Sequence, residues 1–511
     1  MATAKNKHAC LLLEKHMKIK CCNIRPTILV PLILFVLSLA ITLGFHGKGY
    51  DDAYITYRCA HNFAEGNGLI YNTGGNTSAT TTPLLTIILG ILGKITSPNW
   101  IPAWGGIISG LSLFALTLLI WMHAKREQQQ AVAVIAVAWM FANPFLETVW
   151  GGESLMALAL ALGSFYLYFE KRVILAAILC FAAFMTRGEG VIPLIVMITH
   201  TLWKEKRIEW KMPVVVALLM VVWFFVARLL GTSFLPNTLT VKMAQMQSGV
   251  FGPFVKTTLD WYRAYIIGSP TFSGVQPQPI LVVLPVLAGL GAFAWLLKPS
   301  ERWGWIMLWL VLYVVGYSVL SVPFYAWYAF PIYFAGSLCA GMGHHFVEQS
   351  FGKLEPFSIW ASNGIKWSYR ALLLFALATA VYPIVKYSRA PLPQQQKLYT
   401  NAGLWLYNNT KETDTVGFFE IGFLGYYSER YMVDPVGLAN SDVVPHMQER
   451  DFTWAFRNYK PDYIILSPVR WYDRIGCVQE KEWFKSQYEL AASIEEPGYF
   501  DSPLSVYKKI R

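Results

Sequence analysis

Charged side chains are scarce in this sequence: they make up 14% of its 511 residues, whereas hydrophobic residues make up 55%. A soluble domain usually carries about 25% charged residues, so the composition excludes an ordinary soluble protein and indicates a chain embedded in lipid. The net charge of +11 would suit a nucleic-acid partner. The basic residues, however, lie in short clusters between apolar runs, where membrane topology requires them, and we predict no nucleic-acid binding.

Signatures of soluble enzymes are also absent. The sequence contains no GxxxxGKS or GxxxxGKT phosphate-binding loop, no HExxH zinc helix and no GxSxG nucleophile elbow. Its seven cysteines show no regular spacing, so we expect no disulfide-linked core. No internal repeat is apparent, and this gives no support to a transporter built from two similar halves.

Long apolar runs dominate what is present. A helix that spans a membrane needs about 20 mostly apolar residues, and we predict about eleven such helices in a polytopic α-helical membrane protein. Residues 84–92 are apolar but too few to span, and Pro83 precedes them, so we expect a re-entrant or interfacial helix there. The predicted spans cover residues 27–45, 101–123, 131–146, 154–169, 173–186, 190–203, 212–230, 278–297, 303–322, 328–343 and 370–385.

The distribution of Lys and Arg sets the orientation of these spans. With eleven spans and a cytoplasmic N-terminus, the basic loops lie inside, as the positive-inside rule requires. The short outer connections 145–152 and 323–327 contain no Lys or Arg. Counting 84–92 as a further span would invert all later loops and break this pattern. The inner basic loops are 125–126, 171–172, 204–211, 298–302 and 344–370.

This topology divides the chain into three parts. Residues 1–26 form a cytoplasmic tail, residues 27–385 form a transmembrane module with an outer loop at 46–100, and residues 386–511 form an extracytoplasmic domain. The last part has an ordinary globular composition. Short β-rich segments between polar or helical stretches predict a small α/β domain. These segments are 415–417, 431–434 and 463–467.

Two adjacent carboxylates, Asp51 and Asp52, follow the first span shortly after it ends. Arg58 comes two helical turns after Asp51, so the two side chains can share one face of a short helix, and the cation would favour the ionised carboxylate. The structural alternative is a solvated loop in which Asp51 or Asp52 caps the helix N-terminus.

More ionisable and aromatic residues lie at the predicted outer ends of spans. An ionisable residue at membrane depth is costly, so it usually pairs with another group or has a function. Taken alone, each has a structural alternative: Glu153 as an anion at a helix N-terminus, and Arg187 with Glu189 as an ion pair. Their common side of the membrane favours a shared site. The set is Glu153, Arg187, Glu189, Arg228, Lys242 and Tyr328.

Glu153, Arg187 and Glu189, like Asp51 and Asp52, belong to stretches that resemble the membrane-embedded GT-C glycosyltransferases. The resemblance is strongest to the bacterial branch similar to mycobacterial arabinofuranosyltransferases, which use polyprenyl-phosphate donors. The matching stretches occur in family order over most of the chain. They are residues 51–58, 66–72, 82–84, 152–153, 186–190, 235–238, 421–427 and 433–438.

The resemblance implies an enzyme of the bacterial inner membrane whose active site faces the periplasm. It implies transfer of a sugar from a polyprenyl-phosphate donor to an envelope glycan or glycolipid acceptor. Asp51 is then the general base that accepts the proton of the acceptor hydroxyl. Asp52 is the second candidate, and either carboxylate is a possible ligand of a divalent cation, Mg²⁺ or Mn²⁺.

The remaining outer residues take supporting roles in this interpretation. The cations stabilise the phosphate that leaves with the lipid, and we assign this role to Arg58, Arg187, Arg228 and Lys242. Glu153, Glu189 and Tyr328 are assigned to substrate binding. The main alternative is a transporter or flippase of a lipid-linked envelope precursor, and a third is a non-catalytic assembly factor.

Overall fold

The computed structural model describes residues 26–75, 79–143, 145–234, 238–249, 252–268, 278–297, 300–354 and 359–510. Nearly all of the predicted N-terminal tail, and residues 235–237 of one family-like stretch, lie outside the described residues.

The described chain is mostly helical, and a helix occupies each predicted span. Five stretches, 98–126, 211–229, 279–297, 301–319 and 363–409, are long and apolar enough to cross a membrane. The number and direction of the spans stay predictions. The helices are α2 (Pro26–Gly44), α5 (Ile101–Arg126), α6 (Gln130–Phe141), α7 (Ser154–Phe169), α8 (Val173–Thr186), α9 (Val191–Glu205), α10 (Lys211–Leu229), α13 (Val283–Leu297), α14 (Glu301–Val319), α15 (Phe330–Leu354) and α16 (Ile359–Arg389).

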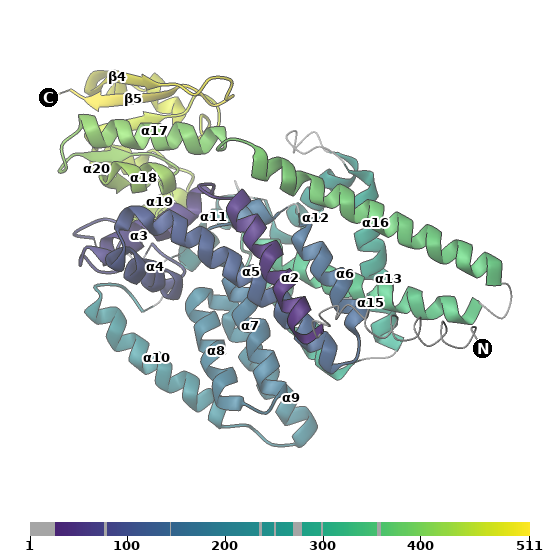
Figure 1. Ribbon diagram of the computed structural model, residues 1–511. Helices are drawn as coiled ribbons and strands as arrows, with labels where there is room; N and C mark the ends of the chain where they lie inside the picture. The colour runs from purple at the N-terminus through teal and green to yellow at the C-terminus, as the bar shows by residue number, and fades with distance from the viewer. Residues whose placement is uncertain are drawn as a thin grey trace, which may run out of the picture.

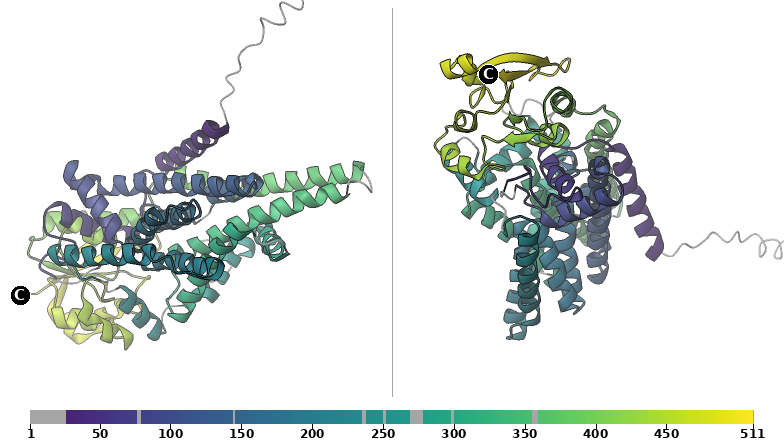
Figure 2. Two further views of the ribbon diagram at one scale, coloured as in Figure 1. Left: turned by 90° about the horizontal axis from the view of Figure 1, so that it is seen from below. Right: turned by 90° about the vertical axis from the view of Figure 1, so that its left-hand side faces the viewer.

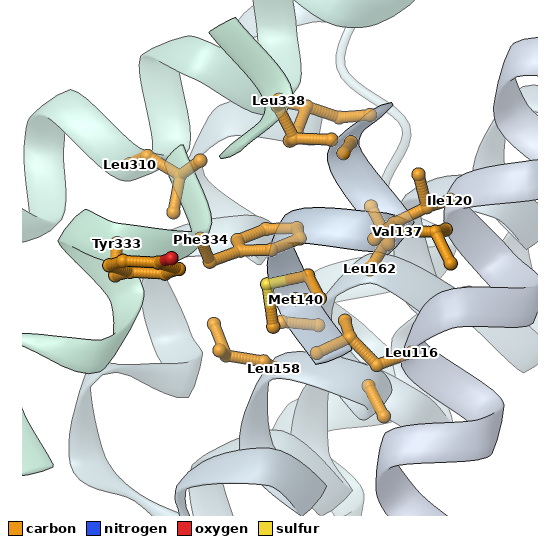
Figure 3. Close-up of a cluster of buried hydrophobic side chains, with 14 of the residues drawn as sticks. Leu116, Ile120, Val137, Met140, Leu158, Leu162, Leu310, Tyr333, Phe334 and Leu338 are labelled. Carbon is orange, nitrogen blue, oxygen red and sulfur yellow. The ribbon is translucent and has the colours of Figure 1, made fainter. Parts of the chain in front are cut away.

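The core of the helical bundle is built from aliphatic and aromatic side chains. Phe334 of α15 lies among Met140 of α6, Leu158 of α7 and Leu116 of α5 (Figure 3), and all four are buried. Other faces keep large apolar side chains exposed: Leu218 on α10 is 62% exposed. A helix that is apolar on its outer face as well as its inner face suits a lipid environment.

Two shorter helices lie at one end of the bundle, next to the C-terminal domain (Figure 1). They are α3 (Asp51–Ala64) and α4 (Pro83–Ile95), which pack along each other. Pro83 is the first residue of α4, a position where its missing N–H costs nothing. The helix predicted at residues 84–92 is therefore present, and at 13 residues it is shorter than a membrane span requires.

The C-terminal domain is a five-stranded mixed sheet with helices around it, at the same end of the bundle (Figure 2). The strand order is β2-β1-β3-β5-β4, with β1, β2 and β3 parallel and β5 antiparallel to its two neighbours. The elements are α17 (Gln394–Asn409), β1 (Thr415–Gly417), α18 (Gly422–Ser428), β2 (Tyr431–Val433), α19 (Val444–Gln448), α20 (Trp454–Tyr459), β3 (Tyr463–Leu466), α21 (Glu482–Gln487), β4 (Tyr488–Ile494) and β5 (Leu504–Lys509).

The three strands predicted from sequence are confirmed as β1, β2 and β3, whereas β4 and β5 were missed. The missed β4 is an edge strand whose first residue is buried and whose next three are exposed. Such a strand lacks the alternation of buried and exposed residues on which strand prediction depends.

Candidate active site

The first turn of α3 brings Asp51 and Asp52 to the boundary between the helical bundle and the C-terminal domain. Both carboxylates lie in the first helical turn, where their negative charge interacts favourably with the unpaired main-chain N–H groups of the helix N-terminus. Neither caps the helix with its side chain, since the N-cap residue is Tyr50 and makes no side-chain cap bond. The capping alternative therefore does not describe these two carboxylates.

Two hydrogen bonds join the Asp51 side chain to the C-terminal domain. Its Oδ2 accepts the N–H of Gly422 at 2.9 Å and its Oδ1 accepts the N–H of Phe423 at 2.8 Å. A Cβ at position 422 would lie 1.9 Å from the main-chain oxygen of Asp51, so only glycine allows this approach. The pKa of Asp51 is raised to about 8, mainly by burial and then by the charge of Glu420. The two main-chain N–H groups lower this pKa, and Arg58 is not among the groups that shift it.

Arg58 lies on the α18 side of α3, but its surroundings differ from those of Asp51. The guanidinium is buried, and burial lowers its pKa, whereas the charges of the neighbouring Tyr71 and Glu429 raise it. The Tyr71 hydroxyl donates to the carbonyl of Ile421 at 2.5 Å. Arg58 thus belongs to the contact between α3 and the C-terminal domain.

Asp52 faces a different environment. In the described part of the chain, no hydrogen bond or ion pair holds its carboxylate. The pKa of Asp52 is raised to about 6. Burial is the main cause, Lys242 opposes the rise, and Glu420 and Glu153 add to it. Asp52 is therefore a half-buried carboxylate with a cation nearby and no hydrogen-bond or ion-pair partner among the described residues.

Lys242 reaches this site from α11 (Thr238–Gln247), which packs on α19 of the C-terminal domain. The side chain is buried, and its Nζ lies 3.6 Å from the centroid of the Tyr325 ring. The Tyr325 hydroxyl donates to Oε1 of Gln245, one turn further along α11, at 3.0 Å. An aromatic ring and a fixed helix thus hold a cation in a dry position next to Asp52.

Arg187 is the centre of a second buried cluster. It donates to Oε1 of Glu153 and to Oε1 of Glu189, both at 2.5 Å, and to the hydroxyl of Tyr317 at 2.9 Å. Its guanidinium also lies 5.0 Å from the centroid of the Tyr328 ring. Because two carboxylates surround one cation, the cluster has a net negative charge when all three groups are ionised.

Tyr50 connects the two clusters. Its pKa is raised by burial and then by the charges of Glu153 and Asp52, so the phenol lies near both carboxylates. A Cβ on Gly152 would lie 2.0 Å from the Tyr50 hydroxyl. The glycine before Glu153 therefore allows α3 to approach the start of α7.

A narrow cavity of about 20 Å³ lies below the Arg187 cluster. Its polar end is formed by Arg187 and Glu189, and its apolar walls come from α7 and α14, including Leu158, Ala161 and Trp309. The cavity has room for about one water molecule.

The other predicted site residue lies apart from these clusters. Arg228 is exposed in the last turn of α10, with its guanidinium 5.5 Å from the centroid of the Phe224 ring. The structure thus brings the predicted site residues together in two groups. One contains Asp52 and Lys242, and the other contains Arg187, Glu153, Glu189 and Tyr328.

Asp51 and Asp52 do not form a metal site with their neighbours. Among the described residues, no three His, Cys, Asp or Glu side chains are placed to hold one ion. Both oxygens of Asp51 already accept main-chain N–H groups. The predicted Mg²⁺ or Mn²⁺ ligands therefore do not fit a shared cation, and we derive no step through one.

The C-terminal domain contributes two groups that the sequence did not point to. Glu420 raises the pKa of Asp52 in addition to burial, and it lies 3.6 Å from Arg470. Arg474 stacks over Trp471, with its guanidinium 4.9 Å from a ring centroid, and its charge counters the effect of burial on the pKa of Tyr325. Neither residue belongs to a recognisable motif, since only the docking of the domain brings it to α3 and α11.

Comparisons with known proteins support the fold. A family model described as a domain of unknown function (DUF8728) matches residues 388–507. No curated protein matches the sequence.

Solved structures match over almost the whole chain. ArnT from Cupriavidus metallidurans bound to undecaprenyl phosphate has 14% identity and a TM-score of 0.56, and the match covers 94% of this chain and 96% of that one. ArnT in the apo state has 13% identity and a TM-score of 0.55, with 93% and 97% covered.

A third match is the Archaeoglobus fulgidus oligosaccharyltransferase in complex with Zn and sulfate. It has 13% identity and a TM-score of 0.50, and the match covers 93% of this chain and 72% of that one. Because the likeness extends from the helical bundle through the C-terminal domain, it concerns the complete architecture. The chain therefore has the fold of ArnT, and the GT-C fold expected from the sequence resemblance is confirmed.

Proposed function

We propose that this protein transfers a sugar from a polyprenyl-phosphate donor to a hydroxyl of an envelope glycan or glycolipid, and that Asp52 is the general base. The observation that carries the proposal is the half-buried carboxylate of Asp52, which has no hydrogen bond or ion pair among the described residues, near the buried Lys242. The likeness in fold to a protein bound to undecaprenyl phosphate supports the class of donor.

Asp52 is preferred to Asp51 because its oxygens are not already used. Both oxygens of Asp51 accept main-chain N–H groups, and a base must have a lone pair directed at the proton it takes. A carboxylate with a pKa of about 6 is ionised at neutral pH and is a stronger base than an ordinary aspartate.

The reaction then balances with these groups. Asp52 takes the proton of the acceptor hydroxyl while the acceptor oxygen bonds to the anomeric carbon. The bond from that carbon to the donor phosphate breaks, and its electron pair stays on the phosphate oxygen. Lys242 lies close enough to Asp52 to lower the pKa of that carboxyl. We therefore assign to Lys242 the role of stabilising the negative charge that develops on the leaving phosphate.

Arg187 takes a positioning role in this scheme. Its charge is already balanced by Glu153 and Glu189, so it offers less attraction to a phosphate than Lys242 does. The Arg187 cluster instead fixes Glu153 and, through Tyr50, the approach of α3. Arg228 is exposed and has no part in the scheme.

The test is a transfer assay with a doubly labelled donor. Purified protein in liposomes is given a panel of undecaprenyl-phosphate sugars, including arabinofuranose, with one label on the sugar and another on the lipid, plus an envelope extract as acceptor. Transfer separates the two labels, with one free undecaprenyl phosphate per glycosylated product. Movement of both labels together across the bilayer would instead show a flippase, and no change in either would favour an assembly factor.

The location of the site follows from the basic loops: the C-terminal domain lies outside the cytoplasm. A cysteine introduced at the exposed Glu412 should react with an impermeant maleimide in intact spheroplasts. A cysteine at Lys125, in a predicted inner loop, is the matched control and should react only after lysis. The reverse pattern would invert the topology.

Asp51→Asn should weaken the contact between α3 and the C-terminal domain. An amide offers one acceptor oxygen, and its NH₂ group opposes the second of the two main-chain N–H groups that Asp51 binds. We expect a loss of about 1–3 kcal/mol in the free energy of unfolding, with transfer reduced but not abolished. Thermal unfolding and turnover of the purified variant measure both effects.

The control for this prediction is Asp462→Asn, a carboxylate within the C-terminal domain whose Oδ2 accepts the N–H of Thr415 at 2.9 Å. It should lower stability without changing turnover of the folded fraction. If Asp51→Asn is fully stable and catalytically dead, then Asp51 is the base and Asp52 is not.

A further inference from the structure

A second cavity lies at the other end of α3. It has a volume of about 520 Å³ and lies between the end of α3, the end of α4 and the last turn of α10. Figure 1 shows the end of α10 approaching α3 and α4 on the side of the bundle away from α16. The helical rise of about 1.5 Å per residue puts Gly66 roughly 20 Å from Asp52, so the cavity is separate from the candidate active site.

The walls of this cavity are apolar and exposed. Ile91 and Ile95 of α4 are 47% and 74% exposed, and Leu229 of α10 is 84% exposed. Helix α10 is one of the stretches long and apolar enough to cross a membrane. We expect α10 to cross the bilayer, which would place its last turn, and the opening of the cavity, at the boundary between hydrocarbon and headgroups.

The floor of the cavity is open because glycines, which have no side chain to fill the space, form it. Gly66 and Gly231 both have positive φ angles, and a Cβ at either would meet no atom within 4 Å. The loop is held in place, since the N–H of Leu69 donates to the carbonyl of Leu230 at 3.0 Å. The cavity is therefore preformed by the packing of the loop on α10.

Two polar side chains line the same cavity, Asn67 and Lys94. Both are exposed, and in the described part of the chain neither has a hydrogen bond or an ion pair. A cation and an amide above an apolar channel suit a molecule with an anionic head and a hydrocarbon tail. Soluble anions would not need the exposed Ile95 and Leu229.

We propose that this cavity binds a glycerophospholipid of the surrounding bilayer, with its phosphate at Lys94 and Asn67 and an acyl chain between α4 and α10. The acyl chain gains van der Waals packing against the apolar walls, and the phosphate pairs with the ammonium group. Such a lipid braces α4, and with it α3, against α10. The inference does not depend on the proposed sugar transfer.

The experiment is native mass spectrometry of the full-length protein in mild detergent, titrated with dioleoyl phosphatidylglycerol. The wild type should retain about one lipid per chain. Ile91→Trp fills the cavity and should reduce occupancy at least about fivefold, and Lys94→Gln should weaken binding about tenfold or more through loss of a charged hydrogen bond. The matched controls are Ile195→Trp, on the 51% exposed position of α9, and Lys256→Gln, whose side chain is 79% exposed.

Both controls should keep wild-type occupancy. Equal lipid occupancy in the wild type, Ile91→Trp and Lys94→Gln would overturn the proposal, since the lipid would then bind elsewhere on the apolar surface. Preferential retention of undecaprenyl phosphate over phosphatidylglycerol in a competition would also overturn it and would assign the cavity to the donor. If Ile91→Trp does not fold, Lys94→Gln alone decides.

Discussion

Asp52→Asn is expected to lower the rate of sugar transfer about 100- to 10,000-fold, the usual effect of losing a general base. The amide keeps the shape of the carboxylate but cannot accept the proton of the acceptor hydroxyl. No hydrogen bond or ion pair holds the Asp52 side chain among the described residues, so the substitution breaks no contact that holds the fold. It also removes the cost of burying a charge, which is what raises the pKa of Asp52.

The matched measurements are turnover, thermal stability and binding of undecaprenyl phosphate for Asp52→Asn and the wild type. Stability should be equal to or above that of the wild type, and lipid binding should be within a few-fold. A dead variant that also unfolds or loses lipid would argue for a structural role. A variant that transfers sugar at the wild-type rate would remove Asp52 from the mechanism.

Arg187→Gln is expected to cost about 3–5 kcal/mol of stability, because it leaves two buried carboxylates without their cation. Glu153 and Glu189 both pair with Arg187 at 2.5 Å, and their side chains are 11% and 19% exposed. Without the cation, one of the two must take up a proton or reach water. Either outcome displaces Tyr50 and the start of α3, so transfer should also fall.

A double substitution separates charge balance from packing in this cluster. Arg187→Gln with Glu153→Gln should regain part of the lost stability, since only one carboxylate is then unpaired. Arg126→Gln is the control, because its ion pair with Glu170 involves an Arg side chain that is 54% exposed and should contribute little to stability. If Arg187→Gln and Arg126→Gln lower the free energy of unfolding by the same amount, burial does not determine how much the Arg187 cluster contributes to stability.

The sequence predicted the helices well because the signal for each of them is local. A run of apolar residues shows its helix without reference to any partner, and α2, α7 and α10 fall where such runs occur. The first three strands were found for a similar reason, since β3 is a short, fully buried segment. In contrast, β4 is recognised only through its pairing with β5.

The roles within the candidate site depended on contacts that the sequence does not show. Asp51 and Asp52 are adjacent and chemically identical, and the difference between them arises from Gly422, 371 residues away. Likewise, Lys242 and Arg228 are both cations on the predicted outer side of the membrane, but only Lys242 is buried near Asp52. Docking of the C-terminal domain on α3 and α11 decides both distinctions.

The pH dependence of single-turnover transfer tests the assignment of the base most directly. With a pKa of about 6, Asp52 is ionised above that pH and protonated below it, and only the ionised form accepts a proton. The rate should therefore fall about tenfold for each unit below pH 6, in the wild type and equally in Asp51→Asn. If the Asp51→Asn variant loses this inflection, or if the wild-type rate stays constant from pH 7 to pH 4.5, then Asp52 is not the base.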